Sequence, residues 1–125
     1  MSMRSADPPT SEIIDRLLAL QTDGPVQMLN LLKLKPETGK ASFRAYSEAI
    51  APILANIGAR SIFAGRYRGA LMGDGDWDTV VIVQYPSAQA FIDMVTSEEY
   101  QAIYHHRDDA LAAAELHVVT PLGSR

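Results

Sequence analysis

Few side chains in this sequence can carry acid–base chemistry near neutral pH, because it holds three histidines and no cysteine. Histidine changes its charge between about pH 5 and 8, so it is the first candidate for moving a proton. His106 directly precedes Arg107, whose guanidinium can bind a carboxylate through two hydrogen bonds. The pair predicts a catalytic acid or base beside an anion contact, and a solvated helix face is the alternative interpretation.

Metal chemistry is not predicted. Adjacent positions on a helix point about 100° apart, so His105 and His106 cannot bind one ion together. The alternating aspartates of GDGDWD (73–78) begin like a calcium-binding loop, but such a loop needs a glycine near residue 79 and a carboxylate at residue 85. The sequence has Thr79 and Tyr85 there. We therefore expect a turn leading into a strand, with neither a metal nor a cofactor.

Asn30 is an uncharged polar residue among the leucines of VQMLNLLKL (26–34). Buried polar groups are normally hydrogen-bonded, so we expect its amide to bond to a neighbouring backbone or across a subunit interface. The alternative is a contact to a ligand in a space enclosed between two sheets. The sequence alone leaves open which face of the sheet Asn30 occupies.

Composition excludes several classes of protein. The chain has 125 residues, 47% of them apolar, which suits one globular domain. Its net charge of −4 opposes a nucleic-acid partner, because such proteins carry a basic face. No apolar run approaches the roughly 20 residues of a membrane span, and no apolar block follows the first residues as in a signal peptide. We expect a cytoplasmic protein with neither nucleic-acid nor membrane partners.

The apolar periodicity predicts a single domain over residues 10–125, preceded by a loose tail over 1–9. The expected elements are a helix over 10–21, a strand over 26–34, a helix over 42–57, strands over 59–67 and 77–85, short helices capped by Ser87 and Ser97, and a strand over 115–122. The apolar stripe of the last helix is expected to run on through Leu111 and Ala114. Over 26–122 the order β-α-β-β-α-β predicts the α+β ferredoxin-like fold, with its main helices on one face of the sheet.

Both faces of that sheet are apolar. In the first strand Met28 and Leu32 point one way while Leu29 and Leu31 point the other, and both parities of 80–83 are apolar as well. A sheet with one wet face would alternate apolar and polar residues. The helix over 10–21 offers too few apolar side chains to cover a sheet face. A second copy, packed sheet to sheet with two-fold symmetry, is therefore expected, and on which subunit that helix packs is left open.

Five segments together resemble the domain-of-unknown-function 1330 family. They are MLNLLKLKP (28–36), FRAYSEAI (43–50), GARSIFAGR (58–66), GDWDTVVIVQYPS (75–87) and SEEYQAIYHHRDDAL (97–111). The family resembles the dimeric α/β-barrel superfamily, which implies ferredoxin-like protomers with facing sheets. That superfamily includes cofactor-free monooxygenases, muconolactone-type isomerases and haem enzymes. The residues that match the family's recurring polar and aromatic positions are Asn30, Tyr46, Gly65, Trp77, Tyr100, His106 and Arg107.

The leading hypothesis is a homodimeric α/β barrel that binds a small organic acid or aromatic metabolite and acts on it without a cofactor. Asn30 and Tyr46 would orient the substrate, His106 would move a proton and Arg107 would hold an anionic group. The predicted substrate contacts are completed by Arg66, which ends a predicted strand, and by Trp77 and Tyr100. The alternative is a non-catalytic dimeric binding or interaction module whose polar residues only hold the interface together.

Overall fold

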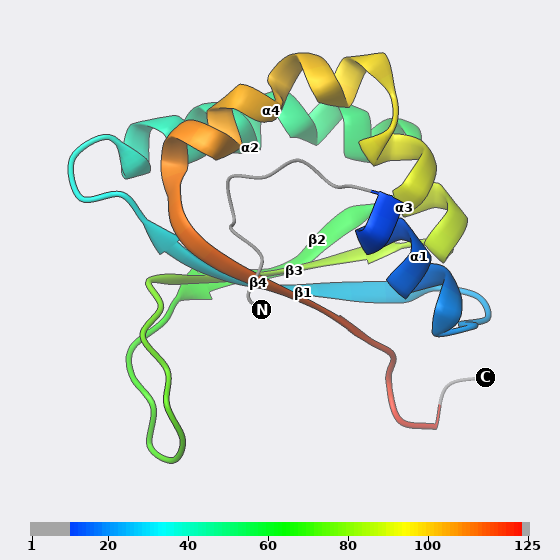
Figure 1. Cartoon of the computed structure of the whole chain (residues 1–125), viewed down its shortest axis with the longest axis horizontal. Helices are drawn as coiled ribbons and strands as arrows, with labels where there is room; N and C mark the ends of the chain where they lie inside the picture. Colours follow the sequence, from blue (N-terminus) through cyan, green and yellow to red (C-terminus); the bar gives the residue numbers. More distant parts are fainter. Residues whose placement is uncertain (1–10, 124–125) are drawn as a thin grey trace.

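The computed structural model describes residues 11–123, which form a four-stranded antiparallel sheet with helices on one side (Figure 1). The strands are β1 (Val26–Leu34), β2 (Arg60–Arg66), β3 (Thr79–Tyr85) and β4 (Leu111–Val119), in the sheet order β2-β3-β1-β4. The helices are α1 (Ser11–Ala19), α2 (Gly39–Asn56), α3 (Ala88–Val95) and α4 (Glu98–Ala110). The predicted ferredoxin-like order after α1 is confirmed. The tail predicted over 1–9 lies outside the described residues.

The main hydrophobic core lies between the sheet and the helices. Backbone register pairs Val26 with Tyr85 and Met28 with Val83, which puts these four side chains on the same face. All four are buried, and Met28 is only 2% exposed. The helix side chains that pack against them are Leu54, Phe91, Ile92, Met94, Val95, Tyr100 and Tyr104.

Two serines begin the C-terminal helices as predicted. Ser87 Oγ accepts a hydrogen bond of 3.1 Å from the backbone nitrogen of Ala90, and Ser97 Oγ accepts one of 3.1 Å from Tyr100 N. Both are N-caps, which satisfy backbone donors that a helix start otherwise leaves without a partner. The caps fix where α3 and α4 begin, and therefore which of their side chains face the sheet.

The opposite face of the sheet is apolar and open. Leu29 pairs with Ile82 and Leu31 with Val80 across β1 and β3, and Phe63 of β2 lies beside Ile82. No helix in residues 11–123 lies on this side (Figure 1). Phe63 is 52% exposed, and the other four side chains are partly exposed. We call these five side chains the open face. The predicted apolar character of this face holds over β1 and β3, whereas β4 presents Glu115 and His117, which pair in register with Leu31 and Leu29.

Helix α1 lies on the same side of the sheet as the other helices and contacts α3. Leu17 is buried in the main core, whereas Leu18 and Leu20 are more than half exposed. The sequence left open on which subunit this helix packs, and the structure places it on its own. It therefore leaves the open face uncovered.

The prediction for the last helix and strand was wrong in its boundary. Leu111 and Ala114, expected on the helical stripe, belong to β4, which spans 111–119 instead of 115–122. Leu111 pairs with Leu34 and Ala114 with Leu32, and Leu111 is almost completely buried. Pairing with β1 and burial outweigh the helix preference of the local alanines.

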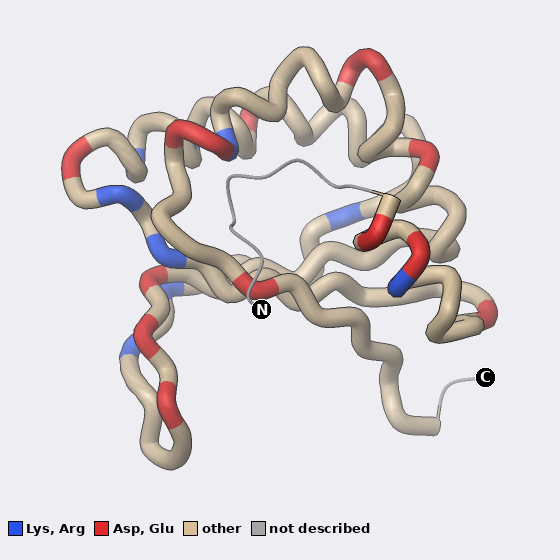
Figure 2. The backbone as a smooth tube through the Cα atoms, in the orientation of Figure 1, with Lys and Arg blue, Asp and Glu red and all other residues tan. Residues whose placement is uncertain are grey.

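Charged residues of both signs are mixed over the described backbone (Figure 2). Lysines, arginines and acidic residues all occur on the helices, strands and loops. Within residues 11–123, no helix is both long and apolar enough to cross a membrane.

Candidate functional site

A pocket of about 490 Å³ lies under α2, between this helix and the sheet. Its walls are mostly apolar, and they include Ile50 and Leu54 from α2 and Val81 and Val83 from β3. The polar or charged residues that line it are Asn30, Tyr46, Ser47, Arg60, Ser61, Tyr85 and Arg107. We call this space the Asn30–Arg107 pocket. A mainly apolar cavity with a few polar groups is typical of a site for a small organic molecule.

Asn30 lies on the helix-covered face of β1. Its amide nitrogen donates to the backbone oxygens of Met28 at 3.2 Å and Val81 at 3.3 Å. The expected bond to neighbouring backbone is therefore present, and Asn30 does not belong to the space between two sheets. Because both donors are directed at the sheet, the amide oxygen Oδ1 is the group that can contact a ligand.

Tyr46 and Tyr100 come from different helices and meet at their hydroxyl groups. The two Oη atoms are 2.9 Å apart, and the rings pack edge to face with centroids 6.3 Å apart. Tyr46 lines the pocket, whereas Tyr100 is buried behind it. The bond ties α2 to α4, which are the helices that cover the pocket side of the sheet. It also leaves the pair one hydroxyl hydrogen that is not shared between them.

Helix α4 brings Tyr100, Tyr104 and Arg107 to one side, because their spacing of four and three residues matches the helical repeat. Arg107 acts electrostatically on the hydroxyls of all these tyrosines and of Tyr46 and Tyr85, in each case lowering the pKa. It also hydrogen-bonds to Tyr104. The guanidinium is therefore within electrostatic range of phenol groups from α2, β3 and α4.

Burial has a larger effect than Arg107 on the pKa of these tyrosines. It raises the pKa of Tyr104 to about 12, even against the opposing effect of Arg107. Burial likewise raises the pKa of Tyr46, of Tyr85 and of Tyr100 above the usual range. All four phenols are thus protonated at neutral pH, when they can donate hydrogen bonds but do not act as bases.

Among the described residues, neither aspartate nor glutamate lines the pocket. The arginines of the lining are Arg107 and Arg60, and the pairing of Arg60 with Gln84 places the Arg60 side chain on the opposite face of the sheet. A guanidinium in the lining of an apolar cavity favours an anionic ligand, because a carboxylate can bind the guanidinium through two hydrogen bonds. The arrangement is suited to a molecule with one acidic group and an apolar body.

Two other predicted contacts lie elsewhere. Arg66 lines a second, more open hollow of about 770 Å³, together with Lys35, Lys40 and Tyr67. Trp77 is half-buried in the loop between β2 and β3. Neither is in the lining of the Asn30–Arg107 pocket. Their predicted roles as contacts to the same substrate are not supported by this placement.

The histidines lie outside the lining of the pocket. His106 is half-buried, and its ring centroid is 4.0 Å from that of exposed His105. His117 Nε2 lies 2.9 Å from Glu115 Oε1 at the surface. In the part of the chain that the structure describes, no three potential ligands come together to hold a metal ion. The structure thus brings together Asn30, Tyr46, Tyr100 and Arg107, with His106 next to the last of them in sequence.

Sequence reasoning missed Arg60 and the small residues that open the pocket. Ser47, Ala51 and Ala55 are spaced by four along α2, and all three line the cavity with Arg60. Small residues at this spacing leave room between a helix and a neighbouring strand. That spacing was the available signal in the sequence.

Comparison with known proteins identifies the family. The model of the family described as "Domain of unknown function (DUF1330)" matches residues 34–121. The chain belongs to the domain-of-unknown-function 1330 family. A protein of unknown function from Rhodopseudomonas palustris is 31% identical, with a TM-score of 0.84 over 96% of this chain and 98% of that one. No curated protein matches.

More distant structures share the fold of this family member. A protein of unknown function from Bacteroides fragilis, described as dimeric and ferredoxin-like, is 18% identical with a TM-score of 0.56, covering 76% of this chain and 94% of that one. A dabb family protein with a ferredoxin-like fold from Mesorhizobium loti is 14% identical with a TM-score of 0.60, covering 81% and 100%. The ferredoxin-like fold predicted from the sequence is confirmed.

Proposed function

We propose that this protein of the domain-of-unknown-function 1330 family binds a small organic acid with an apolar body in the Asn30–Arg107 pocket. The observation that carries the proposal is Arg107 in the lining of a cavity whose described walls are mainly apolar. The carboxylate pairs with Arg107, and the apolar body lies against Ile50, Leu54 and Val83. Burial of that body supplies affinity, while the charge sets orientation.

The polar groups around Arg107 add direction to this binding. Tyr46 is protonated and donates to an acceptor on the ligand through the hydrogen that the pair with Tyr100 leaves over. Asn30 Oδ1 accepts from a hydroxyl or amine of the ligand. A hydroxy or amino acid with an apolar side chain therefore matches more of the pocket than a simple fatty acid does.

Calorimetry with benzoate, and with benzyl alcohol as its neutral analogue, tests the proposal. Wild-type protein is expected to bind benzoate more tightly, because only the acid pairs with a guanidinium. Arg107→Gln should weaken benzoate binding by about tenfold or more, which corresponds to about 1.4 kcal/mol. Arg44→Gln, at an exposed site on α2 outside the pocket lining, is the matched control. Equal benzoate affinity in wild type and Arg107→Gln would contradict the proposal.

A cofactor-independent reaction on the bound acid is a second candidate function. One observation favours it: half-buried His106 directly precedes the pocket residue Arg107 on α4, although His106 itself is not in the described lining. In this version His106 moves the proton while Arg107 holds the acid. If His106→Ala binds benzoate normally and converts a panel of hydroxy acids as fast as wild type, the histidine has no catalytic role.

We also propose that the protein is a homodimer joined through the open face, as a dimeric α/β barrel. Leu29, Leu31, Val80 and Ile82 form a contiguous apolar surface, and patches of this kind mark interaction sites. The dimeric Bacteroides fragilis neighbour with the same fold supports the proposal. Sedimentation that finds only monomers at high concentration would overturn it. A cytoplasmic location and the absence of nucleic-acid and membrane partners stay predictions.

A further inference from the structure

The loop between β2 and β3 leaves the sheet on the side that carries no helices. Residues 67–78 extend away from the open face as a narrow loop that runs out and back (Figure 1). Leu71 and Met72 in this loop are 102% and 93% exposed. They are as accessible as in an unfolded chain, so the fold of this subunit gives them nothing to pack against. We call residues 67–78 the arm and these two side chains its tip.

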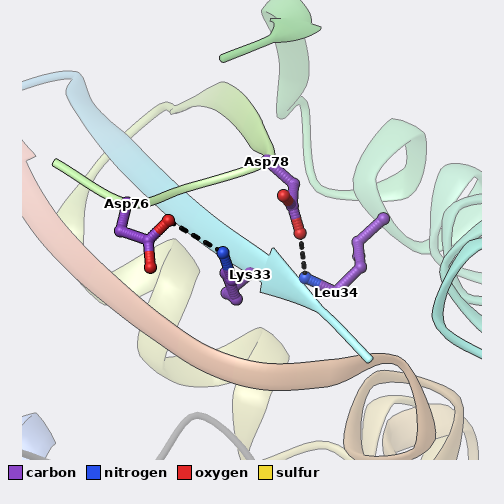
Figure 3. Close-up of polar contacts among 4 residues, drawn as sticks. All are labelled: Lys33, Leu34, Asp76 and Asp78. Carbon is purple, nitrogen blue, oxygen red and sulfur yellow. Dashed lines mark hydrogen bonds and ion pairs between the residues drawn. The ribbon is translucent and has the colours of Figure 1, made fainter. Parts of the chain in front are cut away.

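The base of the arm is held firmly to the sheet. Asp78 Oδ2 accepts from the backbone nitrogen of Leu34 at 2.7 Å, and Lys33 Nζ lies 2.9 Å from Asp76 Oδ1 (Figure 3). Backbone bonds of 2.8 Å from Tyr67 N to Asp78 O and of 2.7 Å from Asp78 N to Leu32 O continue the ladder. Four bonds therefore set the direction in which the arm leaves the sheet.

The two segments of the arm, one on each side of its tip, also pack against each other. A Cβ atom on Gly75 would collide with the Tyr67 side chain. Because glycine has no Cβ atom, the Tyr67 ring can lie against the backbone of Gly75 on the other segment of the arm. Gly73 has a φ of +89°, which supplies the reversal near the tip. The loop is thus organised along its length, although its apolar tip has no contact within the subunit.

We propose that the arm holds a second copy of this chain by placing Leu71 and Met72 on the partner subunit. This inference rests on the proposed homodimer and extends it. The arm projects to the side where the open face would receive the partner sheet. In a two-fold dimer both arms make the same contact, so each tip side chain counts twice.

The ion pair at the base of the arm also favours a second copy of this chain as the partner. Lys33 lies on the same face of β1 as Leu29 and Leu31, because alternate residues of a strand point to the same side. A lysine at an apolar interface is unfavourable unless it is paired. Asp76 of the arm supplies that partner within the same subunit. The arm therefore pairs the charge of Lys33 and adds two apolar side chains beside this face, while Glu115 and His117 of β4, on the same side, are paired with each other.

Sedimentation of a dilution series tests the proposal with the double variant Leu71→Ser/Met72→Ser. The dimer dissociation constant is expected to rise by at least about tenfold, because four apolar side chains leave the interface. Leu18→Ser on α1, exposed on the helix side, is the control and should leave the constant unchanged. Thermal unfolding at a monomeric concentration checks that the variants keep the fold.

A second measurement follows the tip directly. The chain has no cysteine, so Leu71→Cys can carry a single environment-sensitive dye, with Ala102→Cys on α4 as the exposed reference. Emission from residue 71 should shift to shorter wavelength as the dimer forms, and emission from residue 102 should not.

The outcomes separate the arm from the dimer. Monomeric wild-type protein at every concentration would refute the homodimer and the arm contact together. A wild-type dimer whose dissociation constant is unchanged in the double variant, or a dye at residue 71 that stays in water, would overturn the arm contact alone.

Discussion

The two faces of the sheet differ in what they are built to contact. On the helix side, β1 presents Met28 and Asn30 to a core and a pocket that the same chain completes. On the other side, Leu29 and Leu31 have no cover within residues 11–123. Because side chains alternate along a strand, neighbouring residues of β1 lie either on the helix-covered face or on the open face. The proposed ligand pocket and the proposed subunit interface are separated by the thickness of a single sheet.

Polar residues are placed differently on the two faces of the sheet. The pocket side holds Tyr46, Tyr100 and Arg107 between layers that can fix their geometry. The open face is made of aliphatic side chains and Phe63, and it is bordered by two ion pairs, Lys33 with Asp76 and His117 with Glu115. A change on one face should leave the property of the other face intact, which can be tested.

The largest effect is expected from Leu31→Asp on the open face. Burying an unpaired carboxylate from each subunit should weaken the dimer by at least about 4 kcal/mol, or roughly a thousandfold. Sedimentation measures the dissociation constant, and benzoate calorimetry on the same variant checks the pocket. A dimer of wild-type affinity would show that the open face is not the interface.

Met28→Ala on the covered face should act on folding instead. Removing a core methionine that is 2% exposed should lower the free energy of unfolding by about 2–5 kcal/mol, because the cavity fills only partly. Urea unfolding at a monomeric concentration gives this value. Leu31→Ala under the same conditions is the matched control, and a loss as large as that of Met28→Ala would remove the distinction between the faces.

Tyr46→Phe should reduce stability and change its pH dependence. Loss of the bond to Tyr100 should cost about 0.5–1.5 kcal/mol at neutral pH. Burial raises the pKa of Tyr46 in the folded state above the unfolded value of about 10. Above that pH the unfolded chain loses a proton that the folded chain keeps, so stability falls as pH rises.

The measurement is urea unfolding at several pH values from neutral to strongly alkaline. Tyr46→Phe should lose stability less steeply above pH 10 than wild type does, because one of the buried phenols is gone. Identical slopes would mean that Tyr46 ionises as easily in the folded state as in the unfolded chain. Tyr67→Phe, in the arm, provides the comparison outside the buried cluster.

Asn30→Ala should have a small effect on stability and none on assembly. The amide donates only to two backbone oxygens of its own sheet, so its loss should cost about 1 kcal/mol of unfolding free energy. The dimer dissociation constant should not change, because Asn30 faces the helices. A weaker dimer in sedimentation would instead support the interface role that the sequence left open.

Much of the fold could be predicted because its signals are local. The strand over 26–34, the caps Ser87 and Ser97 and the β-α-β-β-α-β order are all confirmed. The start of β4 could not be predicted in this way. Leu111 to Ala114 look helical by themselves, and only pairing with β1 makes them a strand.

The candidate site was predicted in part. Asn30, Tyr46, Tyr100 and Arg107 do come together, whereas Arg66 and Trp77 lie apart from the pocket. The spacing of Tyr100 and Arg107 on one helix is a local property and can be read from the sequence. Which other strand or loop faces that helix depends on packing, so the position of Arg66 outside the pocket could not be predicted.

The sequence by itself determined that both sides of the sheet are apolar and that the helices cover one of them, because side-chain alternation and element order are local facts. Only the tertiary structure decided that Asn30 faces the helices, that α1 stays on that same side, and that the arm projects from the other. These depend on register and packing between distant segments, where a shift of one residue would exchange the two faces.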